Sequence, residues 1–90
     1  MKIFVVTLKL NFLTAGGTTD EYDLTYRTLM EMGHEVVVCT TNPQANNIPH
    51  KLPYKVIEEE IKTQKMLGIQ RGALKIFKKY SSQADAFFFD

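Results

Sequence analysis

Two unbroken apolar runs, separated by an amphipathic stretch, dominate the first half of the chain. Residues 2–8 (KIFVVTL) and 36–39 (VVVC) are rich in β-branched side chains and do not alternate with polar residues. Strands that are covered on both faces of a parallel sheet have this pattern, whereas a strand with one wet face alternates. The pattern predicts two buried parallel strands, the first of them central in its sheet.

A glycine turn and a helix connect these two strands. Gly16 and Gly17 close the loop after the first strand, where the absence of a Cβ permits a sharp turn. Thr18, followed three residues later by Glu21, has the form of a capping box. Apolar residues at positions 22, 26, 29 and 30 share one helical face, and Gly33 supplies a left-handed stop. We predict a helix from residue 18 or 19 to about residue 32, which completes a βαβ unit.

The second half of the chain repeats the alternation less clearly. Residues 41–53 hold three prolines and several asparagines and predict a loop, and residues 54–57 predict a short third strand. Residues 58–67 fit either a helical turn or a mobile loop, and Gly68 and Gly72 leave this region ambiguous. Residues 69–81 predict a helix whose apolar face includes Ile76 and Phe77, and residues 86–89 predict a last strand.

Strands that alternate with helices predict an α/β fold: a Rossmann-like, doubly wound parallel sheet with right-handed crossovers and a strand order of about 3-2-1-4. Such sheets bind ligands at the carboxyl ends of the strands, where the strand order reverses. In this chain that place is the mouth of the first strand, beside Gly16 and Gly17.

Composition narrows the classes of function. Ninety residues suffice for one domain, and 44% hydrophobic with 23% charged residues is ordinary for a globular chain. A net charge of +1 gives no field for nucleic acid, so we expect no nucleic-acid partner. The single cysteine, Cys39, lies in an apolar run and is expected to be a buried hydrophobe in a reducing compartment. No cleavable signal peptide or membrane-spanning stretch is predicted, which indicates a cytoplasmic location.

The charged residues near the glycine turn allow two interpretations. Asp20, Glu21 and Asp23 complement the helix dipole and would repel a phosphate placed directly over the first turn. Any bound phosphate would therefore be held by the loop amides. The alternative is that the acids only stabilise the start of the helix and that the glycines only make the turn. His34 is expected to sit at the helix exit, while the role of His50 stays open.

One face of the second predicted helix is basic and carries Arg71, Lys75, Lys78 and Lys79. Such a face could attract an anionic membrane or a lipid-linked acceptor, which would make the protein peripheral to the membrane. It could equally be a solvated helix face.

The chain resembles the N-terminal domain of GT-B-fold glycosyltransferases, especially glycosyltransferase family 4. The likeness rests on the first strand, on Gly16 and Gly17, on the helix running into the segment from Gly33 to Val38, and on the ending ADAFFFD. It implies that residues 1–90 are the acceptor-side Rossmann-like domain, or a fragment of it, without the donor-binding C-terminal domain. The implied activity of the whole enzyme is transfer of a sugar from a nucleotide sugar to a glycan, lipid or small-molecule acceptor.

The resemblance also implies a set of site residues. Gly16, Gly17 and Thr18 would contact the donor phosphate or the acceptor, and Asp20 and Glu21 would lie on the acceptor side. Family members often place an acidic residue shortly after the two glycines, whereas in this chain Thr18 and Thr19 come before Asp20 and Glu21. The family's catalytic groups lie beyond this chain: paired glutamates in the C-terminal domain and a histidine that neither of the two histidines here matches. We expect no catalytic residue, no metal and no tightly bound cofactor, and inactivity of this piece alone.

Two other classes stay open. A nucleotide-cofactor-binding domain of an oxidoreductase would also begin with a strand, a glycine turn and a helix, but it needs spaced glycines and an acid after the second strand, where this chain has residues 39–42 (CTTN). A phosphate-loop NTPase is disfavoured, because this chain lacks the lysine-containing glycine loop of that class. A non-catalytic α/β interaction module is the other alternative. The last strand is predicted at an apolar edge, so either further residues cover it or the piece self-associates.

Overall fold

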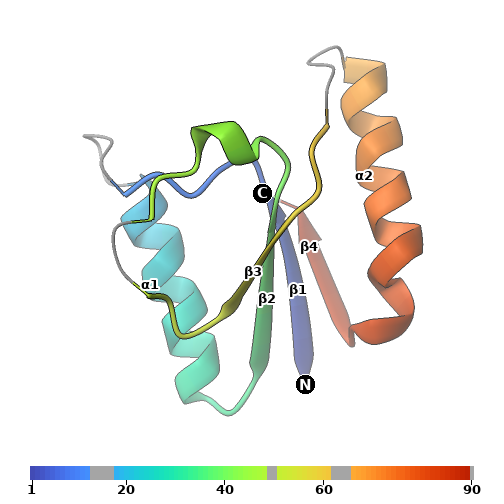
Figure 1. Ribbon diagram of the computed structural model, residues 1–90. Coiled ribbons are helices and arrows are strands. Elements are labelled where there is room, and N and C mark those ends of the chain that lie inside the picture. Colours follow the sequence, from blue (N-terminus) through green and yellow to red (C-terminus); the bar gives the residue numbers. More distant parts are fainter. Residues whose placement is uncertain (13–17, 49–50, 62–65, 90) are drawn as a thin grey trace.

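The computed structural model describes residues 1–12, 18–48, 51–61 and 66–89 and contains one four-stranded, all-parallel sheet (Figure 1). The strands are β1 (Lys2–Thr7), β2 (Glu35–Thr40), β3 (Lys55–Glu58) and β4 (Ala86–Phe89), in the order β3-β2-β1-β4. Two helices, α1 (Thr18–Glu31) and α2 (Met66–Tyr80), and two short 3-10 turns, η1 (Pro43–Ala45) and η2 (Ser81–Gln83), connect them. The predicted fold class and strand order are confirmed.

Strand β1 is central, as its apolar sequence predicts. It pairs in parallel with β2 on one side and β4 on the other, so that Val5 lies between Val38 and Phe88. Five of its six residues are buried. A strand with neighbours on both sides and a helix over each face has no wet surface, which is why no polar residue interrupts the run from Ile3 to Val6.

The two faces of the sheet carry separate apolar clusters, because successive side chains of a strand point to opposite faces. Helix α1 covers one face and α2 the other (Figure 1). The α1-side cluster consists of Ile3, Val5, Leu10, Tyr26, Val36, Val38 and Tyr54. The α2-side cluster consists of Phe4, Val6, Val37, Cys39 and Ile76.

Helix α1 begins at residue 18, as predicted, and ends at Glu31, one residue before its predicted end. Gly33 has a φ of 94°, and its amide donates to the Met30 carbonyl while the His34 amide donates to the Leu29 carbonyl. These bonds satisfy the last carbonyls of the helix and turn the chain into β2. The predicted apolar stripe is only partly right: Tyr26 is buried, but Tyr22 is exposed and stacks on it at the surface.

Helix α2 begins at Met66, three residues earlier than predicted, and includes both glycines that made this region ambiguous. A Cβ on Gly72 would come within 2.7 Å of the Ile61 side chain, so the glycine lets the segment after β3 pack closely against the helix. Ile76 is buried as predicted, whereas Phe77, placed on the same face by its spacing, is 41% exposed.

The remaining boundaries agree within two residues, and one loop residue is more important to the core than expected. Strand β3 begins one residue later than predicted. Tyr54, which was predicted as its first residue, precedes it as a buried side chain. Strand β4 has its predicted range. Leu10, predicted in a loop, is 1% exposed and completes the α1-side cluster.

Candidate functional site

The candidate site is the edge of the sheet at which β1 and β2 end. Thr7, Thr40 and Thr41 are buried there, although they are polar. The Thr41 amide donates to the Thr7 carbonyl at 3.0 Å, and the Thr40 hydroxyl lies 3.5 Å from the Ile57 carbonyl of β3. The ends of three adjacent strands are therefore tied together by polar contacts.

Asn46 joins this edge to the loop that follows β1. Its side-chain oxygen accepts from the Leu10 amide at 2.9 Å, and its side-chain amide donates to the Thr40 hydroxyl at 2.9 Å. One amide side chain thus satisfies a backbone donor of the first loop and a fully buried hydroxyl of β2.

Backbone bonds extend the same join on both sides of Asn46. The Asn42 amide donates to the Leu8 carbonyl, the Asn47 amide to the Leu10 carbonyl, and the Phe12 amide to the Asn47 carbonyl, over 2.8 to 3.0 Å. We name the paired segments 8–12 and 42–47 the asparagine rim. The sequence predicted turns in this region but not the pairing, because nothing local to residues 42–47 identifies residues 8–12 as their partner.

The predicted site residues lie partly beside this rim. Gly16 and Gly17 fall outside the described residues. Thr18 is the first residue of α1, and the neighbouring Thr19 hydroxyl accepts from the Asn11 amide at 3.4 Å. The start of α1 is therefore held against the asparagine rim. Asp20 and Glu21 are exposed in the first turn, as predicted.

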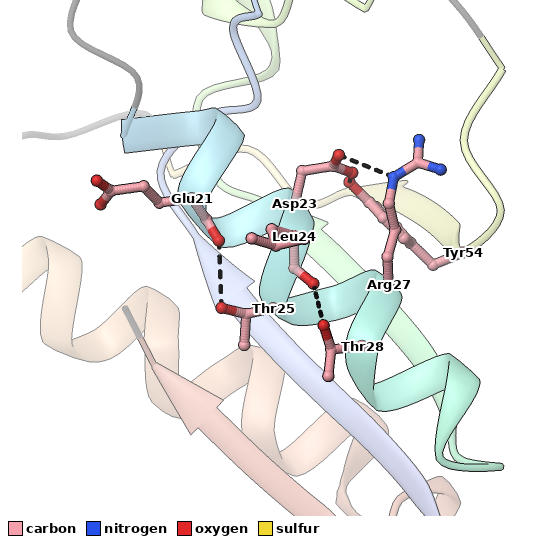
Figure 2. Close-up of polar contacts among 7 residues, drawn as sticks. All are labelled: Glu21, Asp23, Leu24, Thr25, Arg27, Thr28 and Tyr54. Atoms are coloured by element: carbon pink, nitrogen blue, oxygen red, sulfur yellow. Dashed lines mark hydrogen bonds and ion pairs between the residues drawn. The ribbon is translucent and has the colours of Figure 1, made fainter.

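Asp23, the third acid of this helix start, is occupied by other side chains (Figure 2). One of its oxygens accepts from Arg27 at 2.8 Å, and the other accepts from the Tyr54 hydroxyl at 2.5 Å. Burial and this hydrogen bond raise the pKa of Tyr54 above its ordinary value of 10.0. These contacts fasten the segment before β3 to α1, so Asp23 has a structural role that leaves Asp20 and Glu21 as the exposed acids of the first turns.

A second polar cluster follows β3 on the α2 side. The Glu59 carboxylate accepts from the Lys79 ammonium and the Tyr80 hydroxyl, each at 2.5 Å, and these bonds hold the pKa of Glu59 below 4.5. Tyr80 also stacks on Phe4 of β1.

Cys39 is buried as predicted, and desolvation raises the pKa of its thiol to about 11. The thiol is therefore protonated and a poor nucleophile at neutral pH.

Only part of the predicted basic face of α2 takes part in the cluster around Glu59. Arg71, Lys75 and Lys78 are exposed and form no ion pair within the described part of the chain, whereas Lys79 is paired with Glu59.

His34 follows the helix stop as expected, and its Nδ1 is buried without a hydrogen-bond partner. His50 lies outside the described residues.

Residues 1–12, 18–48, 51–61 and 66–89 contain no cluster of three or more side chains suited to hold a metal ion. Within the same ranges, no helix is both long and apolar enough to cross a membrane. Comparisons with protein-family models, with curated proteins and with solved structures gave no match.

Proposed function

We propose that this chain is the acceptor-side, N-terminal domain of a glycosyltransferase of the GT-B type, which works together with a donor-binding domain. The observation that carries the proposal is the position of β1. It is central, and the crossover through α1 leads to β2 on one side while the crossover through α2 leads to β4 on the other. Ligands of doubly wound sheets bind where the order reverses in this way.

The first turn of α1 supports an acceptor-side role. Asp20 and Glu21 are exposed beside the end of β1, and their carboxylates can accept hydrogen bonds from sugar hydroxyls. The same charges oppose a diphosphate placed over the helix start. Under this proposal the chain orients an acceptor hydroxyl, and the sugar nucleotide is held mainly by the partner domain.

The proposal is testable on the 90-residue chain by NMR titration with uridine and guanosine diphosphate sugars and, separately, with NADH. We expect weak nucleotide-sugar binding, with amide shifts confined to residues 8–21. Replacing both acids (Asp20→Asn with Glu21→Gln) should tighten diphosphate binding by roughly two- to five-fold per charge removed, because the repulsion at the helix start is relieved. Glu31→Gln, at the other end of α1, is the matched control and should change nothing.

Two outcomes would overturn the proposal. Tighter binding of NADH than of the nucleotide sugars at the same residues would identify a cofactor domain of an oxidoreductase. No shift at this edge with any of these ligands at millimolar concentration would favour a non-catalytic interaction module.

A further inference from the structure

Helix α2 presents a row of four exposed residues on the side away from the sheet. Arg71, Leu74, Lys75 and Lys78 have the spacing at which residues share one face of a helix. All four are exposed, whereas Ile76, on the opposite side of the helix, is buried in the α2-side cluster. We name these four residues the outward stripe.

The outward stripe carries three positive charges and no negative charge. No acid occurs anywhere in α2. Glu59, the acid that is bonded to this helix, accepts from Lys79 and Tyr80, which lie outside the stripe. The three cations of the stripe therefore form no ion pair with any residue that the structure describes. Like charges three or four residues apart on a helix repel one another, and an anionic partner would relieve this repulsion.

Leu74 distinguishes between the possible anionic partners. It lies among the cations of the stripe, and it is 53% exposed. An apolar side chain gains nothing against the phosphates of a nucleic acid. At a bilayer it can enter the boundary between headgroups and acyl chains, while neighbouring lysine and arginine side chains keep their charges at the headgroups. Leu74 therefore favours a lipid surface.

The position of α2 in the fold leaves the outward stripe open to a flat surface. Helix α2 covers one face of the sheet, and α1 covers the other (Figure 1). Helices that cover the same face of a sheet form one layer and lie side by side. A further helix on this face would therefore lie beside α2 and not over its outward stripe.

We propose that the outward stripe docks the protein on the surface of an anionic lipid bilayer. Helix α2 would lie parallel to the bilayer, with Leu74 among the uppermost acyl carbons and the three cations against headgroup phosphates. Each lysine or arginine near such a surface strengthens binding about five-fold. Three cations and one leucine should therefore give reversible attachment that depends on salt.

Vesicle co-sedimentation of the 90-residue chain tests this proposal. One set of vesicles is phosphatidylcholine alone, and the other contains an equal part of phosphatidylglycerol. We expect binding to the mixed vesicles only, and weaker binding as salt is added, because salt screens the charges. Lys75→Gln combined with Lys78→Gln should weaken this binding by at least about ten-fold. Lys9→Gln combined with Lys51→Gln is the matched control, since both lysines are exposed outside α2.

A substitution of Leu74 tests the apolar part of the contact. Leu74→Ser leaves the charge unchanged and should weaken binding to the mixed vesicles by about three- to ten-fold, because less apolar surface enters the bilayer. Leu24→Ser is the matched control, since Leu24 is 66% exposed on α1, on the other side of the sheet. Circular dichroism of each variant confirms that it is folded.

Several outcomes would overturn the proposal. They are equal binding to both kinds of vesicle, no binding to the mixed vesicles, and equal weakening by a variant and its control. Binding of a short DNA duplex as tightly as of the mixed vesicles would also overturn it and would identify a nucleic-acid surface. The inference does not depend on the glycosyltransferase proposal, since co-sedimentation requires no sugar nucleotide.

Discussion

Single polar side chains decide how the loops at the carboxyl edge of the sheet are held. Asn46 bonds to Thr40 and to Leu10, which is 36 residues away, and Glu59 bonds to Lys79 and Tyr80, which are 20 and 21 residues away. Their residue types are visible in the sequence, but their partners are not, because the contacts arise only after the strands have paired. Local patterns therefore predicted turns and charged loops at these positions and missed both networks.

Asn46→Ala should lower the free energy of unfolding by about 1–3 kcal/mol, because it leaves the Leu10 amide and the Thr40 hydroxyl without this partner. Urea denaturation measures the change. Asn46→Asp keeps the acceptor for Leu10 and should cost less. Asn47→Ala is the control, since Asn47 joins the rim through backbone atoms. Equal effects at the two positions would contradict the role given to the Asn46 side chain.

Glu59 makes a pH-dependent contribution to stability. Its pKa is lowered in the folded state by bonds from Lys79 and Tyr80, so its ionised form is stabilised by folding. The contribution is present above the ordinary pKa of 4.5 and is lost as the pH falls through the folded-state pKa. The difference in free energy of unfolding between wild type and Glu59→Gln should be largest near neutral pH and should disappear in acid. Urea denaturation at several pH values measures it.

The size of this effect should be small, because Lys79 is largely exposed and surface ion pairs contribute little. Glu60→Gln removes a neighbouring exposed charge and is the matched control. A difference between wild type and Glu59→Gln that grows on acidification would contradict the assignment.

At the scale of elements, patterns with strong local causes were predicted well. The unbroken run of β1 and the Gly33 stop of α1 are each set by neighbouring residues. Helix α2 begins three residues before its predicted start, because Gly68 and Gly72 left the sequence of this region ambiguous. One of them, Gly72, instead serves packing against Ile61, a tertiary contact that the sequence does not reveal.

The end of α1 offers a direct test of a backbone effect. Gly33→Ala should destabilise the protein by about 1 kcal/mol, because an alanine at a φ of 94° is strained while its Cβ would meet no atom within 4 Å. Gly33→Asn should cost less, since asparagine tolerates positive φ. Thermal or urea denaturation distinguishes the two. An alanine variant as stable as wild type would show that the turn relaxes.

For the whole molecule, alternation of strands and helices was enough to predict the sheet order, since right-handed crossovers leave few arrangements. The proposed site was predictable only as a place, the mouth of β1. The residues that shape it come from the β2–β3 loop, whose position follows from the assembled sheet. The fold alone does not determine the function, because the pattern that predicts this fold serves many chemistries.

The depth of Cys39 has a practical consequence. The chain has one cysteine, it lies in β2 with no exposed surface, and its high pKa keeps it protonated. A thiol-labelling reagent can reach it only when the centre of the sheet separates. The rate at which the unmodified protein takes up such a label therefore reports how often the molecule opens, without any introduced probe.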